Sequence, residues 1–247
     1  MKYQSRSDSS KKPNALIETV SLSRSYELGS ESIKALQNIN LQVQSGEFLA
    51  IVGRSGSGKT TLLNIMAGLD KPSSGRVLLQ GNDITRMNEK ELTDMRRHTI
   101  GFIFQSFGLL PLLSAFENVE LPLRISSVKH REREERTREA LDMVGLRKRA
   151  NHRPYELSGG EQQRVSIARA IVHKPLLVLA DEPTGELDSI NARSIFGLFK
   201  EMVVDQGISV ISATHDSTLL SMADRVKEIR NGFLEDSSKG RTGRFRP

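Results

Sequence analysis

The sequence predicts an α/β fold built on a mainly parallel sheet. Short apolar runs alternate along the chain with helix-like segments, the order expected where helices connect parallel strands. The runs at 47–52, 176–180 and 208–211 are apolar almost without interruption, as strands buried on both faces are. With 247 residues, the chain is long enough for one large or two small domains with a sizeable core.

The amino-terminal elements begin with strands that we expect to pair antiparallel. Residues 15–21 have a strand-like composition, and residues 39–43 alternate apolar and polar side chains, as strands with one solvated face do. The next elements are predicted in this order: a buried strand at 47–52, a glycine-rich loop, a helix at 59–67 that ends at Gly68, and strands at 75–80 and 99–104.

The carboxyl-terminal half begins with a long, charged and helical region at about 111–157. Within it, residues 129–149 carry eight cations and five anions, and such a run is usually the solvated face of a helix. Beyond this region we expect buried strands at 176–180 and 208–211, separated by a helix at 190–205.

Composition excludes several classes of protein. The chain has no cysteine, so it has no disulfide framework, thiolate nucleophile or cysteine zinc site. Its apolar runs reach about six residues, far below the roughly 20 that span a bilayer, and the first 14 residues lack the apolar core of a secretory signal. We therefore expect a soluble, cytoplasmic protein.

The positive charge lies at the two ends of the chain. Of the net charge of +6, residues 1–14 carry +3 and residues 235–247 carry +2, which leaves +1 for residues 15–234. We expect the ends to be flexible, solvated basic tails; contact with acidic phospholipid is a weaker alternative. The nearly neutral body lacks the basic surface that nucleic-acid binding requires.

A phosphate-binding loop is predicted between the strand at 47–52 and the helix at 59–67. The pattern G-x-x-x-x-G-K-[ST] is matched by Gly53-Arg54-Ser55-Gly56-Ser57-Gly58-Lys59-Thr60. Its glycines let backbone N–H groups approach phosphate at the start of a helix. We expect Lys59 to meet the β- and γ-phosphates and the Thr60 hydroxyl to ligate Mg²⁺, with Thr61 beside them.

Two carboxylates follow the strand at 176–180. An apolar strand that ends in an aspartate such as Asp181 is typical of a site where the carboxylate holds Mg²⁺, usually through water. Glu182 would then face the γ-phosphate and accept a proton from attacking water. The alternative is that both residues only cap the next helix, which Pro183 would start; the phosphate loop upstream favours the metal site.

A second phosphate-facing helix start is predicted at Ser158-Gly159-Gly160-Glu161. Ser158 and Glu161 also have the spacing of a capping box. A capping box does not require two glycines at the first helical positions, where each costs about 1 kcal/mol relative to alanine. Glycines there expose backbone N–H groups to an anion, so the sequence predicts a second phosphate contact.

With these motifs, residues 16–234 resemble the ATP-binding cassette (ABC) family, whose signature is LSGGQ or LSGGEQ. The resemblance implies a P-loop NTPase (RecA-like) core, an antiparallel β subdomain and an α-helical subdomain inserted at about 106–157, all within a nucleotide-binding domain at 15–234. It implies ATP and Mg²⁺ as cofactors, and a homodimer that forms head to tail on ATP binding. Ser158, Gly159 and Gly160 of one copy would then bind the γ-phosphate held by the other.

The resemblance also implies roles for single residues. Gln105 matches the glutamine that contacts Mg²⁺ and the attacking water and couples to a membrane partner. His215 matches the histidine that touches the γ-phosphate, and Tyr26 matches the aromatic residue that stacks on adenine. Asp188 matches the aspartate of the D-loop (residues 185–188) at the dimer interface. Glu186 departs from the asparagine that is common in relatives, and it adds negative charge near the composite site.

Segments 107–111, 117–123 and 180–185 are similar to a bacterial subgroup of macrolide-exporter, lipoprotein-releasing and cell-division ATPases. The resemblance implies an ATP-hydrolysing subunit that drives a separate integral membrane permease, peripheral on the cytoplasmic face of the cell membrane. A mechanical or regulatory ATPase in envelope remodelling or division stays open. A nucleic-acid ATPase is disfavoured, because such relatives usually carry coiled-coil inserts, zinc-binding cysteines or two cassettes.

Overall fold

The computed structural model describes residues 15–29, 31–215 and 217–236. The predicted tails lie outside these residues apart from Glu235 and Asp236. Those two residues belong to strand β10 (Phe233–Asp236), which pairs with β9 (Arg225–Arg230), so the predicted start of the tail at 235 is wrong.

The central sheet has six strands in the order β10-β9-β3-β8-β7-β6. The parallel strands are β9, β3 (Phe48–Val52), β8 (Ser209–Thr214), β7 (Leu177–Asp181) and β6 (Ile100–Ile103), and β10 is antiparallel. Every residue of β3, β7 and β8 is buried. These observations confirm the predicted mainly parallel sheet. The uninterrupted apolar runs of the sequence form its central strands.

The second sheet is antiparallel, as predicted, in the order β2-β1-β4-β5. Its strands are β1 (Ile17–Leu28), β2 (Glu31–Val43), β4 (Ser74–Leu79) and β5 (Asn82–Asp83). β1 is longer than predicted. Its register shifts between Thr19 and Leu22, and such a bulge interrupts the period-two pattern by which a strand is recognised in sequence.

Six α-helices occur in the part of the chain that the structure describes: α1 (Lys59–Met66), α2 (Glu89–Thr99), α3 (Ala115–Ile125), α4 (His130–Met143), α5 (Gly159–Ile171) and α6 (Ser189–Gln206). The region 111–157 contains α3, α4 and two short 3₁₀ helices rather than one long helical stretch. α2 was not predicted: Leu92 is its one buried residue, and most of its other residues are polar or charged. None of the described helices is long and apolar enough to cross a membrane.

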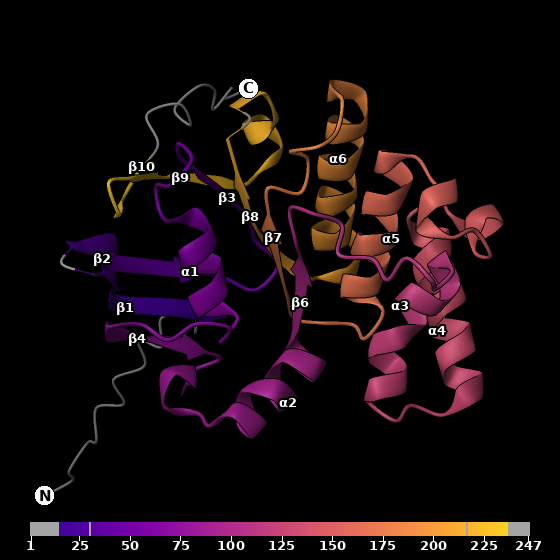
Figure 1. Cartoon of the computed structure of the whole chain (residues 1–247), viewed down its shortest axis with the longest axis horizontal. Coiled ribbons are helices and arrows are strands. Elements are labelled where there is room, and N and C mark those ends of the chain that lie inside the picture. The colour runs from indigo at the N-terminus through magenta and orange to yellow at the C-terminus, as the bar shows by residue number, and fades with distance from the viewer. Residues whose placement is uncertain (1–14, 30, 216, 237–247) are drawn as a thin grey trace, which may run out of the picture.

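The central sheet separates two hydrophobic cores. Leu49, Leu179 and Ile211 pack on the side of α1 and the antiparallel sheet, whereas Phe48, Val178 and Val210 pack with residues of α3, α4, α5 and α6. Successive side chains of a strand point to opposite faces, so each central strand contributes to both cores. Figure 1 shows α1 on one side of β7, and α5 and α6 on the other. The loops that follow β3, β7 and β8 meet at one edge of this sheet.

Candidate active site

The phosphate loop (residues 53–60) connects β3 to α1 and folds around its own lysine. Lys59 is 6% exposed, and its Nζ donates to the carbonyl oxygens of Gly53 at 2.8 Å and Arg54 at 3.2 Å. Gly58 caps α1 with a φ of 109°, and a Cβ there would lie 2.4 Å from the carbonyl oxygen of Ala35. The loop therefore presents a buried ammonium group at the start of a helix, where phosphate binds well.

The Glu182 carboxylate lies between the side chains of a lysine and a histidine. Its Oε1 is 3.2 Å from Lys59 Nζ, and its Oε2 is 2.8 Å from His215 Nδ1. Glu182 has a φ of 46°, a left-handed conformation that costs on the order of 1–3 kcal/mol in a residue with a side chain. Its backbone N–H donates to Ala213 and its carbonyl accepts from Gly185. These bonds hold the turn that directs the carboxylate toward the phosphate loop.

The structure offers oxygen ligands for a cation beside this carboxylate. Asp181 is buried, and its Oδ1 has no hydrogen-bond partner among the described residues. Burial raises the pKa of Asp181, while a hydrogen bond with Thr60 acts in the opposite direction. An orphaned buried carboxylate oxygen next to a hydroxyl fits Mg²⁺, which prefers oxygen ligands.

The alternative that Asp181 and Glu182 only cap the next helix is wrong. α6 starts at Ser189, and its cap is Asp188, whose Oδ1 accepts from the backbone N–H groups of Ile190 and Asn191. These bonds hold the pKa of Asp188 below its usual value. The carboxylates at 181 and 182 therefore do not cap α6.

Gln105 follows β6 and reaches the same turn. A Cβ on Gly185 would lie 3.7 Å from Gln105 Nε2 and an equal distance from Glu182 Cβ. Gln105 is exposed. Three strands of the sheet thus bring Lys59, Glu182 and His215 together, with Gln105 at their edge.

The second glycine-started helix, α5, begins on the other side of the sheet. Ser158 Oγ accepts from the Glu161 N–H at 3.3 Å, and Glu161 Oε2 accepts from the Ser158 N–H at 2.9 Å. The capping box is therefore real. Ser158 is nevertheless exposed, so capping leaves the residue accessible to a ligand from outside its own chain.

Tyr26 makes contacts that the sequence did not suggest. Its hydroxyl donates to Asp70 Oδ2 at 2.7 Å, and the guanidinium of Arg24 lies 4.4 Å from the ring centroid. Adenine stacking on Tyr26 stays a prediction. It would need the ring face that Arg24 does not cover.

Two residues near the site were not predicted from the sequence. Arg169, on α5, donates to the carbonyl oxygens of Phe107 and Gly108 in the loop after Gln105, and burial lowers its pKa. Asn191, on α6, contacts both Asp188 and Gly160. Both lie at helical positions where an ordinary polar residue would be expected, so only tertiary contacts reveal them.

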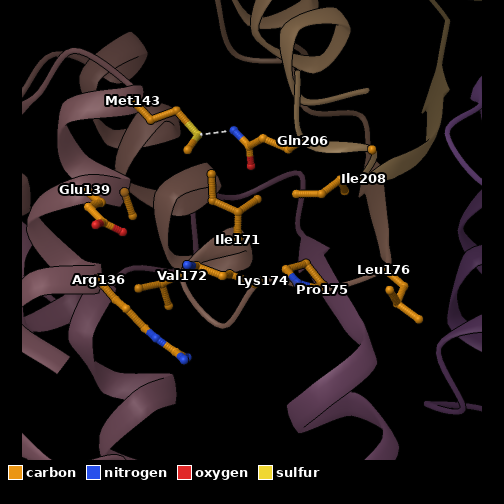
Figure 2. A pocket seen from close by; sticks show the side chains of 12 residues that line it. Arg136, Glu139, Met143, Ile171, Val172, Lys174, Pro175, Leu176, Gln206 and Ile208 are labelled. Atoms are coloured by element: carbon orange, nitrogen blue, oxygen red, sulfur yellow. Dashed lines mark hydrogen bonds between the residues drawn. The ribbon is translucent and has the colours of Figure 1, made fainter. Parts of the chain in front are cut away.

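One cavity lies away from these residues. A space of about 440 Å³ lies at the amino ends of β7 and β8, between α4, α5 and α6, and is lined by Met143, Ile171, Leu176 and Ile208 among others (Figure 2). The candidate site lies at the opposite, carboxyl ends of the strands. We place the chemistry there because the charged groups converge there.

Proteins that place a lysine-bearing phosphate loop beside an acidic strand end are nucleoside triphosphatases, and this fold and site define one. The chain belongs to the ABC transporter family, whose sequence profile matches residues 36–185. Relatives in this family carry the names of both transport activities predicted from sequence, macrolide export and lipoprotein release.

Three comparisons describe this relationship. An uncharacterised ABC transporter ATP-binding protein of Bacillus subtilis is 48% identical, over 89% of this chain and 95% of the relative. The lipoprotein-releasing system ATP-binding protein LolD of Psychrobacter arcticus is 46% identical, over 90% of this chain and 99% of the relative. A dimeric cassette of Methanocaldococcus jannaschii bound to ADP and phosphate superposes with a TM-score of 0.82 at 42% identity, over 89% and 98% of the two chains. The chain is thus an ATP-binding cassette ATPase, and the Methanocaldococcus jannaschii cassette that it resembles is a dimer.

Proposed function

We propose that two copies of this chain enclose two ATP molecules head to tail, and that their closure drives an integral membrane permease carried by a separate chain. One observation carries the head-to-tail arrangement: the phosphate loop enters α1 on one face of the sheet, whereas the signature turn (residues 158–160) starts α5 on the other. A single copy cannot close both glycine-started helices over one phosphate group, so a second copy must supply the missing one.

The phosphate loop, with Thr61, holds the triphosphate, and Tyr26 stacks on the adenine. The signature turn of the other copy contacts the γ-phosphate through Ser158 and the backbone N–H groups of Gly159 and Gly160, and Asp188 lies at the dimer interface. Support comes from the exposure of Ser158 and of the D-loop residues Gly185, Glu186 and Asp188.

Thr60, Asp181 and Gln105 would hold Mg²⁺, which supplies positive charge against the phosphate oxygens when it is bound. The orphaned Oδ1 of Asp181 supports this assignment. A bound cation would also offset the burial that raises the pKa of Asp181.

Glu182 is the general base of this proposal, and Lys59 controls its availability. Phosphate oxygens attract the Lys59 ammonium, which in the structure contacts Glu182 Oε1. Once Lys59 turns to phosphate, Oε1 is free to accept a hydrogen bond, and then a proton, from water. His215 keeps hold of Oε2 and so fixes the direction in which the carboxylate points.

The membrane-bound part of the proposal rests on the relatives and on one surface. LolD acts in lipoprotein release, and a relative in Vibrio parahaemolyticus is a macrolide export ATP-binding/permease protein. Phe104, Leu110 and Leu112, which flank Gln105 in sequence, are 44–79% exposed, and exposed apolar groups of this kind mark interaction sites. We place the assembly on the cytoplasmic face of the cell membrane.

The substitution Glu182→Gln tests the proposed chemistry. The amide cannot accept the proton, so turnover should fall by roughly 10²-fold or more, while ATP binding persists and closed dimers accumulate. ATP hydrolysis and the ATP-dependent dimer fraction, measured by light scattering, report the two effects. Turnover near the wild-type rate would remove Glu182 from the role of general base.

A further inference from the structure

The signature turn packs directly on the D-loop and the first turn of α6 in its own chain. A Cβ added to Gly160 would lie 2.8 Å from Asn191 Oδ1 and 2.9 Å from Asn191 Cγ. A Cβ on Gly159 would lie 3.8 Å from Leu187 Cδ2, an ordinary contact distance. A side chain at position 160 would therefore collide with Asn191 unless Asn191 moved.

Asn191 is also bonded to the D-loop. Its Nδ2 donates to Asp188 Oδ2 at 2.6 Å, and its backbone N–H donates to Asp188 Oδ1 at 2.9 Å. One short side chain thus joins the aspartate of the D-loop to the second glycine of the signature turn.

The D-loop is in turn tied to the catalytic turn. The Gly185 N–H donates to the Glu182 carbonyl at 3.0 Å, and the Leu187 N–H donates to the Thr184 carbonyl at 3.1 Å. Residues 182–188 therefore form a compact, internally bonded segment. These contacts form a continuous path from Glu182 to Asp188 and, through Asn191, to the signature turn.

We propose that Asn191 is a positioning residue that sets the signature turn according to the state of the ATP site in its own chain. This inference rests on the proposed head-to-tail dimer, in which that signature turn serves the ATP bound by the other copy. Asn191 touches no nucleotide; it acts through Asp188 and Gly160. The state of the ATP site in one copy thereby changes the position of that copy's signature turn, which contacts the ATP bound by the other copy.

Mixed dimers with one active site test the inference. Differently tagged full-length copies are combined so that one carries Glu182→Gln. Hydrolysis is then possible at one site. That site combines the phosphate loop of the copy with intact Glu182 and the signature turn of the Glu182→Gln copy. Asn191→Ala is introduced into either copy, and Arg193→Ala, an exposed neighbour on α6, is the matched control.

Asn191→Ala in the copy that donates the signature turn should lower kcat roughly tenfold or more, because misplacement by about 1 Å can cost up to 10²-fold. The same change in the other copy should lower it less than twofold, and ATP affinity of the separate copies should not change. Arg193→Ala should be silent in both. Equal effects from the two copies, or a larger effect in the copy that hydrolyses ATP, would overturn the proposal.

Two measurements need no turnover. In closed dimers whose two copies both carry Glu182→Gln, adding Asn191→Ala should speed dissociation at least about fivefold, because the displaced signature turn binds phosphate less tightly. An unchanged dissociation rate would contradict the inference. Gly160→Ala should lower the thermal midpoint, and adding Asn191→Ala should restore it; no restoration would show that Asn191 is not the obstacle. If Glu182→Gln copies do not dimerise with ATP while Asn191 is intact, the proposed function itself fails.

Discussion

Glu182 shows how much of the site depends on single backbone conformations. Its left-handed φ and its two backbone hydrogen bonds turn the chain sharply after β7. Without that turn, the carboxylate would continue along the strand direction and miss both Lys59 and His215. Strain of this kind persists where the surrounding structure holds it, and it is concentrated at functional sites.

The substitution Gly58→Ala should disrupt the phosphate loop far more than Gly56→Ala. Both glycines have positive φ, but a Cβ at 58 would lie 2.4 Å from the Ala35 carbonyl oxygen, whereas a Cβ at 56 would meet nothing within 4 Å. We expect Gly56→Ala to cost only the backbone strain of about 1–2 kcal/mol and Gly58→Ala to cost clearly more. Urea unfolding measures both. Equal losses would show that β2 moves aside.

The cap of α5 should make stability depend on pH. The hydrogen bond from the Ser158 backbone N–H, with help from the Ser158 hydroxyl and Arg149, holds the pKa of the Glu161 carboxyl below its usual value. This stabilisation is complete above the unfolded-state pKa of about 4.3 and is lost as the pH falls through the lower, folded value. Glu161→Gln should therefore unfold with a shallower pH dependence below about pH 4.5. An unchanged slope in acid denaturation would refute this prediction.

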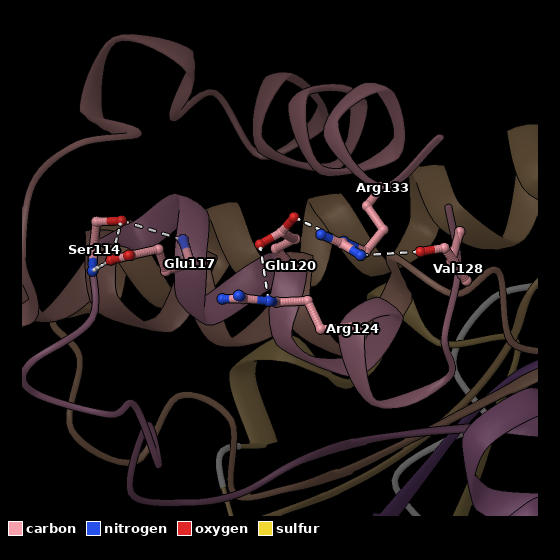
Figure 3. A network of polar contacts seen from close by, with 6 residues as sticks. All are labelled: Ser114, Glu117, Glu120, Arg124, Val128 and Arg133. Carbon is pink, nitrogen blue, oxygen red and sulfur yellow. Dashed lines mark hydrogen bonds and ion pairs between the residues drawn. The ribbon is translucent and has the colours of Figure 1, made fainter. Parts of the chain in front are cut away.

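At the scale of elements, an ion pair between the buried Glu120 and the partly exposed Arg133 joins α3 to α4. Glu120 Oε1 accepts from Arg133 Nε at 2.9 Å, and a second guanidinium nitrogen of Arg133 donates to the Val128 carbonyl (Figure 3). Arg124 approaches the other carboxylate oxygen at 3.7 Å. The pair fixes the packing of two helices whose exposed faces are strongly charged.

The substitution Arg133→Ala should destabilise the chain by about 3 kcal/mol, because it leaves the Glu120 carboxylate buried without its main partner. Arg138→Ala is the matched control: it removes an exposed pair with Glu134 on the same helix and should cost less than about 1 kcal/mol. Urea unfolding compares the two variants. Similar losses would mean that solvent reaches Glu120 and replaces the arginine.

At the scale of the whole molecule, the arrangement of the sheet supports the proposal that the active site is shared. The two glycine-started helices lie on opposite faces of it, so complementation between copies is expected. Lys59→Ala disables the phosphate loop, and Ser158→Ala disables the signature turn. In a mixed dimer of the Lys59→Ala and Ser158→Ala variants, one ATP site contains both substitutions and the other contains neither.

Mixing these two impaired variants should therefore restore ATPase activity, measured by phosphate release after mixed dimers have been purified through two tags. Each variant mixed with itself is the control. Ser158→Ala also removes a helix cap, which costs about 1 kcal/mol, so its folding should be checked first. No recovery in confirmed mixed dimers would count against shared sites, or show that both sites must be intact for turnover.

Much of the architecture follows from local patterns. The apolar runs at 47–52, 176–180 and 208–211 became β3, β7 and β8, and the glycine-rich loop lies between β3 and α1 as predicted. Helix α2 and the strands β9 and β10 were not predicted. They bury few side chains, so hydrophobic periodicity leaves little trace of them.

The sequence by itself predicted the chemistry that we propose for this protein: a lysine and glycines for phosphate, carboxylates at a strand end, and a second glycine-started helix. Such motifs can be recognised because their residues are close together in the chain and share one local conformation. Tertiary structure alone decided that Glu182 bridges Lys59 and His215, that Asn191 fills the space beside Gly160, and that the two glycine-started helices lie on opposite faces. Those relations depend on how distant strands pair and which face each side chain takes, and local spacing does not encode them.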